Sequence, residues 1–145
     1  MLNISHYKII AIGKIKKKWI QEGIEMYLKR LPDLTIKEIK DSTQKKEEHT
    51  IKEFISKNET IVTLNENGQY FTSKQLATKL LASQNQNITF VVGSASGLSP
   101  SLNNSASWQL SLSPLTFPHD IARLLLIEQL YRAKTISQRG PYHKG

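Results

Sequence analysis

Short apolar runs alternate with longer segments of helical spacing along the whole sequence. The first run, YKIIAIG, is apolar over most of its length and ends at a glycine, which is typical of a buried strand. The second run, LTIKEIK, alternates apolar and charged residues, as a strand with one face in water does. The predicted strands are residues 7–13, 34–40, 60–64, 88–92 and 108–113.

The segments between these strands are predicted to be helices. The second helix has Ser42 or Thr43 as its candidate cap, and the polar run NENGQY after the third strand has the chemistry of a turn. The predicted helices are residues 16–30, 42–58, 73–84, a short one near 101–107, and a long one that starts at Pro118. Strands alternating with helices predict an α/β fold, with a mostly parallel sheet and helices on both faces. No repeat, low-complexity tract or linker interrupts the pattern, so one domain over residues 1–145 is expected.

The last helix follows an unusual turn, LTFPH. Pro118 has the fixed φ that suits a first helical turn, Thr116 is a candidate cap, and Asp120 lies where the helix dipole favours an acid. His119 is interpreted as a helix-start residue. The following residues are apolar over more than one stripe, which predicts burial on two sides and favours a subunit interface as well as a core. Glu128 and Arg132 are spaced for a helix-surface ion pair.

In open α/β sheets, ligands bind beyond the carboxyl ends of the strands. Three such ends carry candidate residues: Leu64, Gly93 with Gly97, and residues 112–117. The glycine loop GSASG has no P-loop lysine and does not satisfy G-x-G-x-x-G, so it does not indicate a phosphate or dinucleotide site. Its glycines allow a ligand to approach the main chain closely, although a sharp turn without a ligand explains them equally well.

Composition excludes several kinds of chemistry. The chain has no cysteine, which rules out disulfides, thiolate catalysis and cysteine-ligated metals. The four histidines are far apart in sequence, and no metal is expected. The amino-terminal segment lacks the pattern of a secretory signal, and no run reaches the roughly 18 to 20 apolar residues of a membrane span. A cytoplasmic protein without a membrane contact is expected.

Charge indicates the partner. The formal net charge is +8, and an excess of this size in a small domain favours a polyanion, above all a nucleic acid, over a role in solubility alone. The basic residues form two clusters, one in KIKKKW near the amino end and one in RAKTISQRGPYHKG at the carboxyl end. The residues expected to contact RNA are Lys16, Lys17, Lys18, Arg139 and Lys144.

Several motifs together resemble one known family. The stretches IIAIGKIKKKW, VTLNENG, FVVGSASGLSP, LSLSPLTFPHDIARLLLIEQLYRA and PYHKG are similar to those of the bacterial ribosomal RNA large-subunit methyltransferase H family, which belongs to the SPOUT class. The resemblance covers almost the whole chain. It implies an α/β fold with a trefoil knot in the carboxyl-terminal part, a homodimer, and S-adenosylmethionine as the cofactor.

The resemblance also implies an activity and a set of site residues. The activity is methylation of a pseudouridine of 23S ribosomal RNA at ring nitrogen 3, with the assembled ribosome as the expected partner. The cofactor residues that it implies are Leu64, Gly93, Leu112, Ser113, Pro114, Leu115, Thr116 and Phe117. The family usually has a second glycine where this chain has Ser94, and a positive φ at that position would strain a serine by about 1 kcal/mol or more.

The chemistry of the methyl transfer suggests roles for the carboxyl-terminal residues. The donor is already activated, so the enzyme has to hold the base and the methyl group in line and to help the imide lose its proton. His143 is a candidate proton acceptor, and Arg132 or Lys144 can stabilise the developing charge. Tyr142 completes the candidate catalytic set His143, Arg132 and Tyr142.

Two other functions remain open on the sequence. A SPOUT enzyme of this kind could act on transfer RNA, and the Ser94 change leaves room for a non-catalytic RNA-binding protein on the same scaffold.

Overall fold

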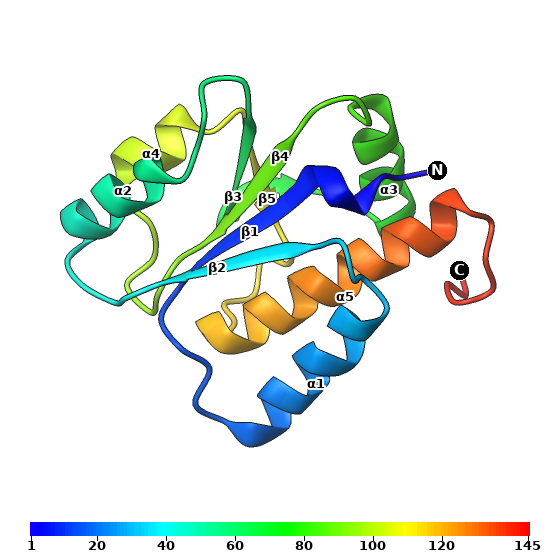
Figure 1. Ribbon diagram of the computed structural model, residues 1–145, viewed down its shortest axis with the longest axis horizontal. Coiled ribbons are helices and arrows are strands. Elements are labelled where there is room, and N and C mark those ends of the chain that lie inside the picture. Colours follow the sequence, from blue (N-terminus) through cyan, green and yellow to red (C-terminus); the bar gives the residue numbers. More distant parts are fainter.

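The computed structural model describes residues 1–145 and contains one sheet with helices on both of its faces (Figure 1). The elements in chain order are η1 (Ile4–His6), β1 (Tyr7–Ile12), α1 (Lys18–Lys29), β2 (Thr35–Ile39), α2 (Gln44–Glu53), β3 (Thr60–Tyr70), α3 (Ser73–Ala82), β4 (Ile88–Val92), α4 (Pro100–Ser105), β5 (Trp108–Ser111) and α5 (His119–Ser137). The predicted α/β class is confirmed. None of these helices is long and apolar enough to cross a lipid bilayer.

The sheet has the strand order β2-β1-β4-β3-β5, and every pairing in it is parallel. The two apolar runs, β1 and β4, pair with each other near the middle of the sheet. The half-polar β2 lies at an edge, where one side needs no partner strand. All five carboxyl ends therefore lie along the same side of the sheet, because parallel strands share a direction. This row of strand ends is called the carboxyl edge, or simply the sheet edge.

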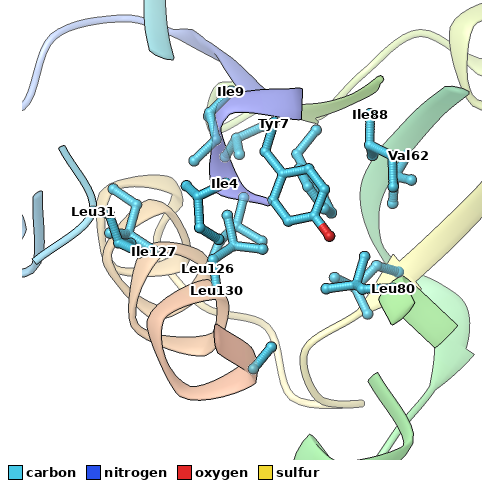
Figure 2. Packing of buried hydrophobic residues seen from close by; sticks show 14 of the residues in the cluster. Ile4, Tyr7, Ile9, Leu31, Val62, Leu80, Ile88, Leu126, Ile127 and Leu130 are labelled. Carbon is cyan, nitrogen blue, oxygen red and sulfur yellow. The ribbon is translucent and has the colours of Figure 1, made fainter. Parts of the chain in front are cut away.

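The side chains of β1 alternate between two hydrophobic clusters, one on each face of the sheet. Ile9 belongs to the larger cluster, which α1, α3 and α5 complete, and Figure 2 shows it packed with Leu126, Ile127 and Leu130. Ile10 belongs to the smaller cluster, to which α2 and α4 contribute. The fold is thus a three-layer sandwich with most of its core beneath α5.

Helix α5 lies between α1 and α3 against the sheet (Figure 1). None of its residues from 119 to 137 is in the exposed class, which agrees with the predicted burial on two sides. Arg123 of this helix is only 3% exposed and forms an ion pair with Glu38 at 2.6 Å. It also donates to the carbonyl oxygens of Ile12 and Gly13, at 3.4 and 2.7 Å. The first turns of α5 are thereby tied to the carboxyl ends of β1 and β2.

The turn predicted at residues 65–70 was wrong, because β3 continues to Tyr70. Its pairing with β5 shifts register, so that Leu64 and Gln69 both face Leu110 and residues 65–68 form an excursion between them. The excursion passes so close to β5 that a Cβ on Gly68 would lie 2.7 Å from the Gln109 carbonyl oxygen. The polar residues that suggested a turn are therefore a bulge within a strand.

Two predicted caps are settled by the structure. Thr43 caps α2, since its hydroxyl accepts a hydrogen bond from the Lys46 amide, and this helix is shorter than predicted. The cap proposed at Thr116 was wrong. Pro118 occupies the N-cap position of α5 without any side-chain cap, and the Thr116 hydroxyl donates to Glu66 instead.

The close approach at Gly68 generates a stability prediction. Gly68→Ala should lower the free energy of unfolding by about 1–3 kcal/mol, because the new methyl group meets a backbone carbonyl that cannot move aside. Urea denaturation followed by circular dichroism measures the change.

Gly23→Ala is the matched control, because its Cβ would be 3.4 Å from the nearest Leu124 methyl, in ordinary contact. It should leave the protein unchanged or stabilise it by up to about 1 kcal/mol through helix propensity. Equal effects of the two variants would contradict the close packing of the excursion on β5.

Candidate functional site

A cavity of about 670 Å³ opens at the carboxyl edge of the sheet, beyond β4, β3 and β5. This volume is within the range of small-molecule sites. Its walls come from the β3 excursion, the glycine loop after β4, the segment between β5 and α5, and the first residues of α5. The lining residues are Leu64, Asn65, Glu66, Val92, Gly93, Ser94, Ala95, Gly97, Leu98, Asn103, Leu110, Leu112, Ser113, Leu115, Thr116, Phe117, Pro118, His119 and Ala122.

The three predicted strand ends do meet in this cavity. Of the cofactor residues that the family resemblance implied, those that line it are Leu64, Gly93, Leu112, Ser113, Leu115, Thr116 and Phe117. Pro114 is not among the lining residues, and it is exposed. His119, interpreted from sequence as a helix-start residue only, begins α5 and lines the cavity as well.

The glycine loop approaches the cavity with its main chain. A Cβ on Gly93 would lie 3.0 Å from the Gly97 carbonyl carbon, so a side chain at this position would push the loop apart. Gly97 has a φ of +76°, which favours glycine. The strain considered for Ser94 does not arise, because its φ is not positive. Its hydroxyl lies 3.1 Å from that of Ser96, within the loop.

Helix α2 holds this loop in place from the other side. The Gln44 side chain donates to the carbonyl oxygens of Ser96 and Gly97, at 2.9 and 3.4 Å. Glu48, one turn further along, accepts hydrogen bonds from Ser99 and Ser101 at the start of α4. Hydrogen bonds from Lys52 and Ser99 hold the pKa of Glu48 below its usual range, so it stays ionised. The cavity wall therefore depends on a helix that does not itself reach the cavity.

The charge of the cavity differs from that of the chain as a whole. No lysine or arginine lines it, and Glu66 is its only acid, although the net charge of the chain is +8. Hydrogen bonds hold both the side chain and the main chain of Glu66. Its carboxylate accepts one from the Thr116 hydroxyl, and its main-chain carbonyl oxygen accepts one from the Ser111 hydroxyl at 3.0 Å. The cavity therefore suits a neutral or cationic ligand and disfavours a polyphosphate.

Sequence reasoning missed the polar lining residues Asn65, Glu66 and Asn103. The first two follow directly on the third strand, in the run interpreted as a turn, so their position at a strand end was the available signal. No group of three or more His, Asp or Glu side chains lies close enough together to hold a metal ion.

The candidate catalytic residues Arg132, Tyr142 and His143 lie together around Glu128, at the carboxyl-terminal end of α5. Oε1 of Glu128 accepts from Nε of Arg132 at 3.0 Å, from Nη2 of Arg132 at 2.5 Å and from the Tyr142 hydroxyl at 3.0 Å. Nη1 of Arg132 lies 3.1 Å from Nδ1 of His143. The hydroxyl of Tyr27, from α1, lies 3.2 Å from that of Tyr142. The tail is thus docked against two helices.

Electrostatics sets the protonation of two of these groups. The hydrogen bond to Glu128 raises the pKa of Arg132 still further above neutrality. Burial raises the pKa of Tyr142, and its hydrogen bonds with Tyr27 and Glu128 raise it more. Tyr142 is therefore a neutral phenol that donates a hydrogen bond, which makes it unsuitable as a proton acceptor.

The structure does not bring this tail cluster to the cavity of its own chain. Ala122 lines the cavity and Arg132 carries the cluster, and between these positions α5 rises roughly 15 Å, at about 1.5 Å per residue. Figure 1 shows the carboxyl terminus at the far end of α5 from the sheet edge.

The two basic clusters are also apart. Lys16, Lys17 and Lys18 are exposed between β1 and the start of α1, on the same edge of the sheet as the cavity. Arg139 and Lys144 are exposed at the other end of α1, where Lys134 donates to the Arg30 carbonyl oxygen at 3.3 Å. One chain therefore presents two separate basic surfaces.

Comparison with known proteins identifies the class. Residues 5–143 match the family described as "Predicted SPOUT methyltransferase", and the chain belongs to this family. The resemblance seen in the sequence motifs is thereby confirmed.

Named relatives narrow the class further. The chain is 88% identical over 144 residues to the "Ribosomal RNA large subunit methyltransferase H" of Prochlorococcus marinus (strain NATL2A), with 99% of both chains covered. It is 48% identical over 143 residues to the protein of the same name from Synechococcus sp. (strain CC9902), again with 99% of both covered.

A solved structure shows the same fold at low identity. A probable methylase family protein from Haemophilus influenzae Rd KW20 superposes with a TM-score of 0.59 at 10% identity, over 99% of this chain and 72% of that one. This likeness bears on the fold alone.

Proposed function

We propose that this protein transfers the methyl group of S-adenosylmethionine to ring nitrogen 3 of a pseudouridine in the 23S RNA of the large ribosomal subunit. The observation that carries the proposal is the full-length identity of 88% to a protein named "Ribosomal RNA large subunit methyltransferase H". The cavity at the sheet edge supports it, because its walls are the segments that the family resemblance assigns to the cofactor. The whole chain, residues 1–145, would act as one SPOUT domain, with the trefoil knot of that class in its carboxyl-terminal part.

The cavity fits the proposed cofactor chemically. S-adenosylmethionine carries a sulfonium and an ammonium group against one carboxylate, so its net charge is positive. A wall with Glu66 and without lysine or arginine suits this charge. Leu64, Leu112 and Phe117 offer apolar surface for an adenine ring, and the lack of a side chain at Gly93 leaves room for a ligand to approach the main chain. The residues proposed to hold the cofactor are Leu64, Gly93, Leu112, Ser113, Leu115, Thr116 and Phe117, with Pro114 in support from the same segment.

The cofactor, when bound, supplies an activated methyl group. The work left to the protein is to hold the acceptor nitrogen in line with that methyl, at roughly 3–3.5 Å. The base also has to lose its imide proton, and positive charge or hydrogen-bond donors near its carbonyl oxygens lower the energy of the anion that results. We propose that the tail cluster of Arg132, Tyr142 and His143 supplies this charge and one free donor, because Arg132 is cationic and Nε2 of His143 is not used within the chain, while Tyr142 helps to hold the cluster together.

A homodimer resolves the separation of cavity and tail. Roughly 15 Å along α5 is too far for one tail to serve the cavity of its own chain. We therefore propose that the tail of one copy completes the cavity of the other. Leu115 supports a contact at the cavity rim, since it is 70% exposed there.

The basic residues would then contact RNA from both copies. Lys16, Lys17 and Lys18 lie on the cavity edge of one chain, and Arg139 and Lys144 would arrive with the tail of the other. Such a composite surface suits the assembled ribosome, in the cytoplasm, as the substrate. RNA backbone contacts of this kind weaken as salt rises.

The assay that tests the function uses S-adenosylmethionine with a labelled methyl group. Ribosomes from cells that lack the enzyme should accept label in 23S RNA, at one pseudouridine located by mass spectrometry, whereas bulk transfer RNA should accept none. Label in transfer RNA would favour the alternative substrate. No label in either, together with no heat on calorimetric titration with the cofactor, would favour a non-catalytic RNA-binding protein.

The charge of the cavity predicts a selective effect of Glu66→Gln. This variant should weaken binding of S-adenosylmethionine about tenfold, because it removes the only acidic side chain of the cavity. S-adenosylhomocysteine lacks the sulfonium charge and should lose less affinity, which isothermal titration calorimetry of both ligands can measure. Equal losses would mean that Glu66 acts only through its hydrogen bond with Thr116.

The shared site predicts complementation between two inactive variants. Gly93→Val should push apart the glycine loop that forms a wall of the cavity, and His143→Ala should remove a tail group. When the two are co-expressed, half of the dimers should be mixed, and each should hold one complete site, which restores about a quarter of the wild-type turnover. Activity that stays at the level of the single variants would show that cavity and tail act within one chain.

A further inference from the structure

The contact between Arg132 and His143 fixes the tautomer of the histidine. Nη1 of Arg132 lies 3.1 Å from Nδ1 of His143. A guanidinium can only donate hydrogen bonds, so Nδ1 has to accept and cannot carry a proton. The ring proton of the neutral imidazole is then on Nε2. A proton on Nδ1 would place two donors against each other at this distance.

The arginine has little freedom to change this arrangement. Its Nε and Nη2 both donate to Oε1 of Glu128, which leaves Nη1 as the end that faces the histidine. Its Cζ lies 4.7 Å from the centre of the Tyr142 ring, and Tyr142 donates to the same Glu128 oxygen. Oε2 of Glu128 accepts from Gln129 at 2.9 Å, so the carboxylate is itself held on both oxygens.

This geometry leaves His143 with a donor and without a free lone pair. The lone pair of Nδ1 is engaged by Arg132, whereas Nε2 makes no hydrogen bond within the chain and its ring is only half-buried. An imidazole in this state cannot take a proton from a substrate unless it first breaks the contact with Arg132. It can donate one hydrogen bond through Nε2–H.

We propose that His143 is a hydrogen-bond donor in the methyl transfer and not its general base, and that Arg132 is the positioning residue that holds the required tautomer. This inference rests on the proposed function. Nε2–H of His143 would donate to a ring carbonyl oxygen next to the acceptor nitrogen, where negative charge develops as the imide loses its proton. Glu128 and Tyr142 act through Arg132 by fixing its orientation.

The step balances with solvent water as the proton acceptor. The N–H bond of the imide breaks and its proton passes to water, and the electron pair left on the nitrogen forms the new N–C bond to the methyl group. The C–S bond breaks and its electrons return to sulfur, which becomes a neutral thioether. His143 keeps its own proton throughout, so no protein base has to be regenerated after turnover.

Two isosteric variants distinguish whether His143 acts as a hydrogen-bond donor or as a general base. His143→Gln keeps an N–H donor near the position of Nε2 but cannot act as a base, whereas His143→Glu can accept a proton but cannot donate when ionised. With the full-length dimer and ribosomes as substrate, His143→Gln should keep single-turnover rates within about tenfold of wild type. His143→Glu and His143→Ala should be about 10²–10³ slower, which is the usual loss on removing one donor to a developing anion.

A spectroscopic measurement on the wild-type protein tests the tautomer independently of activity. Long-range ¹H–¹⁵N spectra above neutral pH should show Nε2 of His143 protonated and Nδ1 unprotonated, and Arg132→Met should allow the two tautomers to mix. A proton on Nδ1 in the wild-type protein would overturn the proposal.

The single-turnover rates would overturn the proposal if His143→Gln were as slow as His143→Ala, or if His143→Glu were faster than His143→Gln. Binding of S-adenosylmethionine should change little in all three variants, because His143 is proposed to contact the base and is not among the residues proposed to hold the cofactor. A wild-type protein that methylates no RNA would refute the proposed function instead, and the tautomer measurement would still stand.

Discussion

The buried guanidinium of Arg123 is the interaction on which the site depends. Parallel strands bring their carboxyl ends to one edge, and the first residues of the last helix form one wall of the cavity at that edge. Arg123 fixes this helix, because it donates to the carbonyl oxygens of Ile12 and Gly13 at the end of β1 and pairs with the carboxylate of Glu38 on β2, while it is only 3% exposed. Removing one partner of such a contact leaves buried charge or buried carbonyls without a partner. The segment between β5 and α5 is therefore held at the carboxyl ends of the strands, where it lines the cavity.

Charge is separated within this small protein. The cavity holds one acid and no base, whereas exposed lysines lie on the same sheet edge outside it. The proposed cationic cofactor and the proposed RNA substrate would thus bind to neighbouring surfaces without competing for the same residues. In the tail, the charge of Arg132 is paired with Glu128, and the same arginine also donates a hydrogen bond to His143.

The order of elements could be predicted because β1 and β4 are apolar runs and the helices have clear spacing. The cavity residues Leu64, Gly93 and Thr116 followed from the rule that ligands bind at strand ends. The excursion of β3 could not be predicted, because its polar residues have turn chemistry and only pairing with β5 keeps them in the sheet. The docking of the tail was equally hidden, since the Tyr27–Tyr142 contact joins residues 115 positions apart.

Helix α5 has the cavity at one end and the tail at the other. It is continuous over 19 residues and has no exposed position, so the elements packed against it hold its length and direction. One inserted residue would turn everything beyond it by about 100° and advance it by about 1.5 Å. The tail would then lose its contact with Tyr27 of α1 and point in another direction. The length of α5 therefore sets both the distance and the relative orientation of the cavity and the tail. Insertions and deletions should be tolerated in the loops but not in α5.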